Sequence, residues 1–405
     1  MFQYLKRLFA QFKLHHYSAA MIRNAHKLGV LLADIRTFVS ERWHPIEDEI
    51  DRNGEIPPVV VDELRRKGYF GWSIPEAYGG LGLTAEELVL CAMELSQASV
   101  ALRARVGTNT GIGSEALVAD GSDAQKSLWL PRMARGEVTG CLALTEPEAG
   151  SEATNIQTSA RREGDHYVLN GVKRFITNAP VADLFTVVAR TGEAKQGQAG
   201  LTAFIVERGA GLRTGEPYRK MGQAGSPVSD VFLDDCRVPA SGVIGGQEGI
   251  GFKTVMKVLN KQRLHLAALC TGPAIRMLHL AVAHAARRRQ FGQAVANFQL
   301  VQAMIADCRT EIFAARSMIL EAARARDRGE DVTLSASMCK YFASEMCGRV
   351  ADRCVQIFGG SGYVADFSPI ERYYRDVRLF RLYEGTSQIH QLNIAKLTLR
   401  EQSAQ

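Results

Sequence analysis

The sequence lacks an uninterrupted apolar run long enough to cross a membrane as a helix, which takes about 20 residues. It also lacks a strong excess of either charge: the formal net charge of +6 is spread along the chain and does not indicate nucleic-acid binding. Charged residues make up 23% and hydrophobic residues 46%, as in a globular protein with a full core. The length of 405 residues suggests two or three domains.

No CxxC pair and no cluster of cysteine and histidine with metal-ligand spacing is present, so no metal site is predicted. The eight cysteines lie mostly within apolar helical or strand patterns. They are expected to be small buried hydrophobic side chains in a reducing compartment.

No GxGxxG motif follows a strand and no regular βαβ alternation appears, so a Rossmann domain is disfavoured. Internal repeats and low-complexity tracts are absent as well. Instead, residues 138–245 contain short β-branched or aromatic segments separated by glycine, asparagine and proline. These predicted strands cover residues 139–145, 166–169, 184–189, 201–206 and 228–233. The pattern is that of a central antiparallel β domain.

Helical patterns flank this domain, with residues 34–137 before it and 246–405 after it. Residues 85–95 are a run of helix formers, and residues 336–358 form another that ends at two glycines. A bundle seam with steps of three and four residues comprises Val301, Ile305, Cys308, Ile312, Ala315 and Ile319. The predicted order is therefore α, β, α, and the fold class is α+β.

Residues 1–33 contain no acidic residue and form a basic amphipathic extension. Phe2, Leu5, Phe9 and Phe12 recur at helical spacing. No apolar region with a small-residue cleavage site is evident, so a secretory signal is not predicted. The extension could be a helix packed on the body, a helix that contacts a membrane surface or a partner, or an organelle transit peptide.

A carboxylate near the C-terminus, Glu384, lies between Tyr383 and Gly385. Apolar surroundings disfavour its charged form and raise its basicity toward that of a general base. Gly385 lets a ligand approach the backbone closely. By itself, the segment fits a plain loop at a helix end equally well.

Four other segments carry ambiguous signals. Thr145-Glu-Pro-Glu-Ala-Gly-Ser151 offers N–H groups and hydroxyls after a strand, and Phe175 and Thr177 share one strand face. The arginines at 287–289 form a solvated face or bind a pyrophosphate, and Gly359-Gly360 is a helix cap or part of a site.

The order and spacing of five segments are more specific. Thr145–Ser151, Phe175–Thr177, Arg288–Gly292, Gln356–Gly360 and Tyr383–Gln388 on an α–β–α chain resemble the acyl-CoA dehydrogenase family of flavoproteins, from about Asp34 to about Lys396. The resemblance implies an N-terminal helical domain, a barrel-like β domain and a C-terminal four-helix bundle. It also implies FAD between the β domain and the bundle across a subunit interface, a homotetramer built as a dimer of dimers, and electron transfer to an electron-transfer flavoprotein.

The resemblance assigns residues to the flavin. The flavin ring region would contact Leu142, Ala143, Leu144, Thr145, Ser151, Phe175, Ile176 and Thr177. Phe175 stands where the family usually has tryptophan. The neighbouring subunit would contribute Arg288, Phe291, Gln299, Gln356, Ile357, Phe358, Gly359 and Gly360, and the pocket would be completed by Thr386 and Gln388.

The implied reaction is α,β-dehydrogenation of an acyl-CoA thioester, with Glu384 as the base. Some members carry the base on another helix, but the matching residue here is Gln262, which cannot act as one. Arg263 would then set the electrostatics around Glu384, or lie on a helix surface. Asn260 stands where several members have aspartate and, with Ser151, Arg263 and Gly385, would line the substrate site.

Arg103 has a spacing similar to the arginine with which glutaryl-type members hold a distal carboxylate; an exposed or ion-paired helix arginine is the alternative. Three other functions fit the pattern: an oxidase, an enzyme acting on acyl groups tethered to a carrier protein, and a non-catalytic scaffold. The expected location is the bacterial cytoplasm or the mitochondrial matrix.

Overall fold

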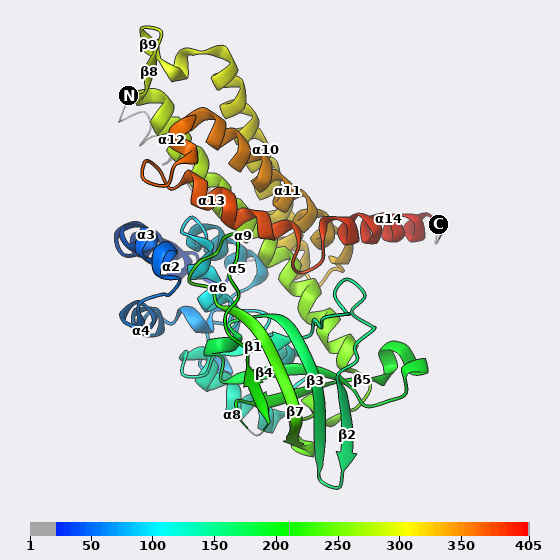
Figure 1. Cartoon of the computed structure of the whole chain (residues 1–405). Coiled ribbons are helices and arrows are strands. Elements are labelled where there is room, and N and C mark those ends of the chain that lie inside the picture. Colours follow the sequence, from blue (N-terminus) through cyan, green and yellow to red (C-terminus); the bar gives the residue numbers. More distant parts are fainter. Residues whose placement is uncertain (1–21, 210, 404–405) are drawn as a thin grey trace.

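A computed structural model describes residues 22–209 and 211–403, and the predicted extension up to residue 21 lies outside the described residues. Figure 1 shows three parts: a helical N-terminal domain, a curled sheet, and long helices that rise away from the sheet. The predicted α+β fold with a central β domain is confirmed.

The N-terminal domain is helical, as predicted. Its helices are α2 (Ala25–Thr37), α3 (Glu47–Asn53), α4 (Pro58–Arg66), α5 (Ala85–Leu95), α6 (Val100–Gly107), α7 (Glu115–Asp120) and α8 (Asp123–Ala134). α5 has the predicted bounds because Thr84 and Glu87 form a capping box at its N-terminus. α2 runs across the boundary placed at residue 34, and its Leu28, Leu32 and Ile35 are buried.

The central domain is a seven-stranded curled sheet. Its strands are β1 (Gly140–Ala143), β2 (Ser159–Glu163), β3 (His166–Thr177), β4 (Leu184–Arg190), β5 (Leu201–Glu207), β6 (Leu212–Thr214) and β7 (Val228–Pro239). Most pairs are antiparallel, as expected, but β1 runs parallel to β4, and β2 meets β4 in parallel at one residue pair. The sheet is therefore mixed rather than purely antiparallel.

The C-terminal domain contains the longest helices. Its elements are α9 (Gly251–Arg287), the hairpin β8 (Arg289–Gln290) and β9 (Gln293–Ala294), α10 (Gln299–Asp327), α11 (Thr333–Phe358), α12 (Gly360–Tyr363), α13 (Ile370–Val377) and α14 (Ser387–Ser403). α9, α10 and α11 pack together, and α14 projects sideways (Figure 1). The predicted seam on α10 is confirmed: Cys308, Ile312, Ala315 and Ile319 are buried.

α9 is the only helix of the described chain that is long and apolar enough to cross a membrane. Of its most apolar window, 67% is buried inside the molecule, as in a core helix. All eight cysteines are buried and free, which confirms their expected packing role.

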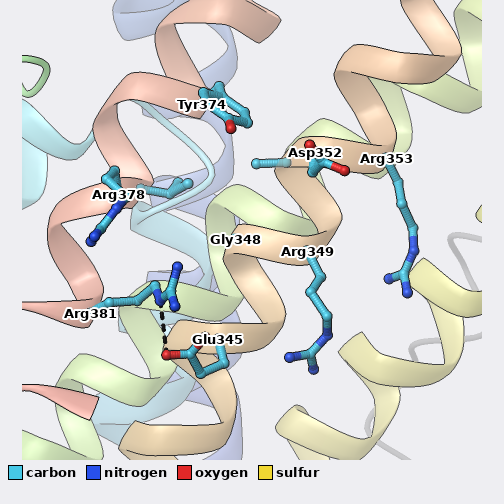
Figure 2. Close-up of a pocket in the computed structure, with 10 residues that line it drawn as sticks. Glu345, Gly348, Arg349, Asp352, Arg353, Tyr374, Arg378 and Arg381 are labelled. Atoms are coloured by element: carbon cyan, nitrogen blue, oxygen red, sulfur yellow. Dashed lines mark hydrogen bonds and ion pairs between the residues drawn. The ribbon is translucent and has the colours of Figure 1, made fainter. Parts of the chain in front are cut away.

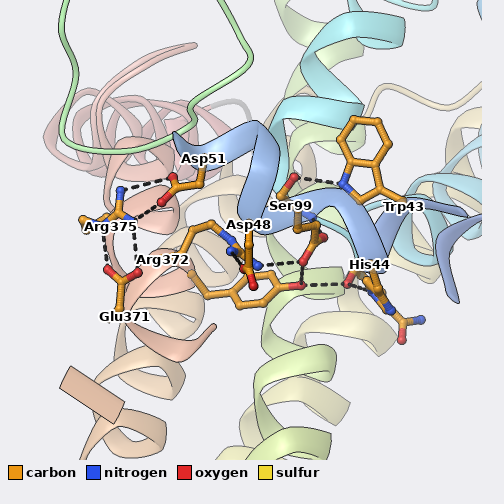
Figure 3. Close-up of polar contacts among 11 residues, drawn as sticks. Trp43, His44, Asp48, Asp51, Ser99, Glu371, Arg372 and Arg375 are labelled. Atoms are coloured by element: carbon orange, nitrogen blue, oxygen red, sulfur yellow. Dashed lines mark hydrogen bonds and ion pairs between the residues drawn. The ribbon is translucent and has the colours of Figure 1, made fainter. Parts of the chain in front are cut away.

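A buried polar network ties α13 to the N-terminal domain (Figure 3). The Arg372 guanidinium donates to the buried Glu47 carboxylate at 2.9 Å, and that carboxylate also accepts the backbone N–H of Ser99 at 2.5 Å. Arg375 pairs with Asp51 at 2.9 Å. These contacts fix α13, which leads directly into the segment that carries Glu384.

Candidate active site

Glu384 lies in a short loop between the 3-10 turn Arg378–Arg381 and α14. Its φ is 54°, in the left-handed region that side chains other than glycine rarely adopt, and Gly385 follows at 92°. Such a residue costs on the order of 1–3 kcal/mol and persists only where its surroundings hold it. The loop is therefore a strained segment, which is typical of a functional site.

The Glu384 carboxylate lies among three cations from three different helices. Its Oε2 atom is fully buried and accepts no hydrogen bond. Burial raises the pKa of Glu384 above its ordinary value, and Arg103, Lys340 and Arg263 oppose this by favouring the ionised form. The site thus holds a carboxylate of raised pKa in partly desolvated, positively charged surroundings.

Arg263 is 6% exposed, which excludes the surface-helix interpretation. Its Nη1 donates to Asn260 Oδ1 at 2.8 Å, while Nε is buried without a partner. Asn260 therefore orients Arg263. Gln262 is fully buried, and neither of its amide atoms has a hydrogen-bond partner.

Arg103 is 8% exposed, and its Nε is buried without a partner. None of the close ion pairs among the described residues includes Arg103, although its charge favours the ionised form of the nearby Glu384. The exposed and ion-paired interpretations both fail. The Asn178 side chain donates to the backbone of α6 at Ala104 O, 2.8 Å away, so the end of β3 adjoins the helix that carries Arg103.

The predicted flavin-ring residues gather where β1 and β3 end. The Arg174 N–H donates to Thr145 O at 2.7 Å, which joins the loop after β1 to β3. Phe175 is 62% exposed, with φ of 59° at a bulge between β3 and β7, whereas the Ile176 side chain is buried in the sheet core. Ile176 can therefore offer only its backbone. Leu142 and Ala143 are buried, Leu144, Thr145 and Thr177 are half-buried, and Ser151 is exposed.

A buried ion pair missed by sequence reasoning supports this loop. Lys173 Nζ donates to Glu146 Oε1 at 2.7 Å and to Val188 O at 2.6 Å. Glu146 also accepts the N–H groups of Gln157 and Thr158. Glu146 thus fastens the loop from within and is not free for a ligand. The only indication of this ion pair in the sequence is the presence of a lysine within a strand.

The other predicted FAD residues lie at the far end of α9. Arg288 and Gln356–Gly360 line a surface groove of ≈ 590 Å³ beside the β8–β9 hairpin. We call this groove the FAD cradle. Added Cβ atoms at Gly359 and Gly360 would meet nothing within 4 Å, so the cradle is open at these two glycines. Phe291 is 93% exposed on the hairpin, and Gln299 is exposed too. All three arginines at 287–289 are exposed.

One chain does not bring the two groups of residues together. α9 starts against β5, where Gly251 contacts Thr202 and Ala203, and its 37 residues span about 55 Å. Figure 1 shows the hairpin and the sheet at opposite ends of the molecule. Thr386 is half-buried and Gln388 exposed at the start of α14, near Glu384.

A second groove of ≈ 460 Å³ lies between α11 and α13 (Figure 2). Its arginines are Arg349, Arg353, Arg378 and Arg381. Arg349 and Arg353 pair with Glu311, and Arg381 pairs with Glu345 at 2.8 Å, so most of this charge is compensated within the chain.

Comparison with known proteins gives the same three-part division. Models of the acyl-CoA dehydrogenase N-terminal, middle and C-terminal domains match residues 23–137, 141–236 and 249–399. A 3-(aryl)acrylate reductase of Clostridium sporogenes is 41% identical, covering 90% of this chain and 96% of the relative. The caffeyl-CoA reductase-Etf complex subunit CarC of Acetobacterium woodii is 37% identical, covering 88% and 93%.

Among solved structures, butyryl-CoA dehydrogenase from Megasphaera elsdenii is 33% identical, with a TM-score of 0.88 over 92% of this chain and 98% of that one. The fold and the matched domains define an FAD-dependent oxidoreductase. The chain belongs to the acyl-CoA dehydrogenase family.

Proposed function

We propose that the protein converts an acyl-CoA thioester to its trans-2-enoyl-CoA, with Glu384 as the base for the α-proton. The observation that carries this proposal is the buried, unpaired Oε2 of Glu384, whose pKa burial raises above its ordinary value. A general base works best when its pKa approaches the operating pH.

The chain supplies two further groups for this reaction. The backbone N–H of Glu384 has no acceptor among the described residues, so it can donate to the thioester oxygen as negative charge develops there. The positive charges of Lys340 and Arg263, which lie near Glu384, stabilise the same charge. When bound, FAD supplies the acceptor for the hydride that leaves the β-carbon, and the loss of proton and hydride leaves a Cα=Cβ bond.

FAD fits the two residue groups when they come from different chains. Arg288 and the open glycines suit a pyrophosphate, and the half-buried hydroxyls of Thr145 and Thr177 suit the polar edge of a flavin. The distance along α9 supports the proposal that a second copy of the chain completes each site. We expect a homotetramer that exchanges electrons with an electron-transfer flavoprotein.

The first prediction concerns Glu384→Gln. This variant should keep FAD but lose most activity, by about 10²–10⁴-fold, because the amide cannot accept the α-proton. Anaerobic bleaching of the flavin by a panel of straight, branched, aromatic and dicarboxylic acyl-CoAs measures the loss. Bleaching of the variant at the wild-type rate by any of them would overturn the role of Glu384.

Reduction of an enoyl-CoA is a second candidate direction, because two relatives are named as reductases of unsaturated acids or thioesters. A raised pKa suits it equally, since protonated Glu384 would then deliver the α-proton. Mixing 2-enoyl-CoA thioesters with dithionite-reduced enzyme tests this direction. Rapid reoxidation in that assay, with slow bleaching by saturated thioesters, would make reduction the principal activity.

The surroundings of Arg103 indicate which acyl groups the protein would accept. The Arg103 Nε is buried without a hydrogen-bond acceptor, and a substrate anion would supply one. We propose that Arg103 binds a carboxylate at the far end of the acyl chain.

A further inference from the structure

Two buried side chains, each from a different helix, contact the carbonyl groups of Glu384 and Gly385. Lys340 Nζ on α11 donates to Gly385 O at 2.7 Å, and His390 Nε2 on α14 lies 3.2 Å from Glu384 O. We propose that Lys340 and His390 are positioning residues that hold this backbone and so keep the Glu384 carboxylate directed into the pocket. The inference rests on the proposed role of Glu384 as the base.

We call the contacts of Lys340 and His390 with this backbone the clamp. The backbone conformation explains why the clamp is needed. Glu384 has φ of 54° and Gly385 has φ of 92°, so two consecutive residues lie in the left-handed region. A glutamate has no intrinsic preference for this conformation and would relax to a commoner one if unrestrained. Relaxation would swing the carboxylate away, because the Cα–Cβ direction follows the backbone.

His390 is suited to the task by burial and protonation. It is 0% exposed, and burial lowers its pKa to about 3, so the ring is neutral. A carbonyl oxygen only accepts, so the ring proton must be on Nε2. A Cβ added at Gly385 would lie 3.0 Å from that nitrogen, so the imidazole packs directly on the glycine.

Lys340 adds a charge to its hydrogen bond. Its side chain is 0% exposed, and its hydrogen bond goes to a neutral carbonyl rather than to a carboxylate. Burial lowers the pKa of Lys340, whereas the nearby Glu384 favours its charged form. The ammonium group therefore holds Gly385 and, through space, stabilises the ionised Glu384.

Glu345, also on α11, fastens both ends of the loop. Its Oε1 accepts Arg381 Nε at 2.8 Å and Ser387 Oγ at 2.5 Å, on either side of Glu384 (Figure 2 shows the contact with Arg381). Removing the Lys340 or His390 contact should therefore release the middle of the loop without detaching its ends.

The test compares Lys340→Met, His390→Leu and His390→Gln with Lys257→Met, a control that removes a half-exposed lysine paired with Asp120. Each FAD-loaded variant is assayed for flavin content, Tm and the pH dependence of kcat/KM with the best acyl-CoA. Lys340→Met should lose on the order of 10²-fold in kcat, because small misplacements of a base are costly. The acid limb should also move to higher pH, because only Arg103 and Arg263 then favour ionised Glu384.

His390→Leu should lose about tenfold in kcat through the missing hydrogen bond, with no displacement of the acid limb because His390 is uncharged. His390→Gln, which keeps an N–H donor, should recover most of that loss. Wild-type kcat and acid limb in Lys340→Met, or equal losses in both His390 variants at equal flavin content, would overturn the clamp. If Lys340→Met does not fold, the His390 pair decides. Wild-type activity in Glu384→Gln would instead refute the proposed base.

Discussion

At the residue scale, Arg103 and Arg105 show how neighbours on one helix can differ in what they require. Arg105 Nη1 donates to Thr139 Oγ1 at 3.2 Å, and its guanidinium lies over the Phe70 ring at 5.3 Å. Arg103 is as well buried, at 8%, but its Nε has no partner. Arg105 is a structural residue, whereas Arg103 leaves a buried hydrogen-bond donor for a ligand to satisfy.

We therefore predict that dicarboxylyl thioesters turn over better than monocarboxylyl thioesters of equal length. Arg103→Ala should lower that ratio by about tenfold or more, the worth of one charge-assisted hydrogen bond. Arg105→Ala is the matched control and should reduce stability while leaving the ratio of kcat/KM values unchanged. An unchanged ratio in Arg103→Ala would remove the distal carboxylate from the proposal.

The site residues that could be predicted are those that lie in a recognisable sequence motif. Glu384 lies beside a glycine and an aromatic residue, which made it a candidate base, and the family resemblance then favoured that role. Arg263 was identified through the resemblance alone. Lys340 and His390 were missed because a lysine or histidine in a helix usually lies at the surface. Only the fold reveals that both converge on the Glu384 loop.

At the element scale, α13 is held by charges buried against α3 as well as by the apolar packing of Ile370, Tyr373 and Val377. Arg372 and Glu47 are 5% and 3% exposed, and Arg372 also bonds to Asp48. Breaking a buried pair from one side leaves an uncompensated charge. Because α13 leads into the Glu384 loop, its placement matters for the site as well as for stability.

Arg372→Met should consequently destabilise the folded chain by about 3 kcal/mol, seen as a lower midpoint of urea unfolding. Arg328→Met removes a partner of the exposed Glu330 and should leave the midpoint unchanged. Equal midpoints for the two variants would show that the network in Figure 3 contributes little.

Helices and strands with a clear hydrophobic pattern were predicted well, whereas short or polar strands were not. α5 and the α10 seam follow from helix formers and apolar spacing. β2 was missed because Ser159–Glu163 is largely polar and exposed, and β6 has only three residues. The parallel pairing of β1 with β4 depends on the route of the chain between them, which local sequence does not encode.

At the scale of the whole molecule, the sheet with the predicted flavin-ring residues and the FAD cradle lie at opposite ends of one chain. The Glu384 loop is bonded to Lys340 near the start of α11, whereas the cradle lies at the end of that helix. We predict that two inactive variants complement each other when their subunits are mixed. In a mixed pair of Glu384→Gln with Gly360→Trp, which fills the open cradle, one site keeps both its base and its cradle. Unfolding and refolding the two together should restore on the order of a quarter of wild-type activity.

Each variant refolded alone is the control and should stay inactive. Failure to complement, with mixed oligomers demonstrated by differently tagged chains, would mean that each chain builds its own site.

The 37 residues of α9 also fix the distance and the angle between the sheet and the β8–β9 hairpin. One inserted residue would advance the hairpin by about 1.5 Å and rotate it by about 100° around the helix axis. Arg288 would then face away from the site on another chain to which we propose it contributes. Insertions and deletions among relatives should therefore accumulate in surface turns such as residues 191–200, whereas the number of residues between Gly251 and Arg287 should stay fixed.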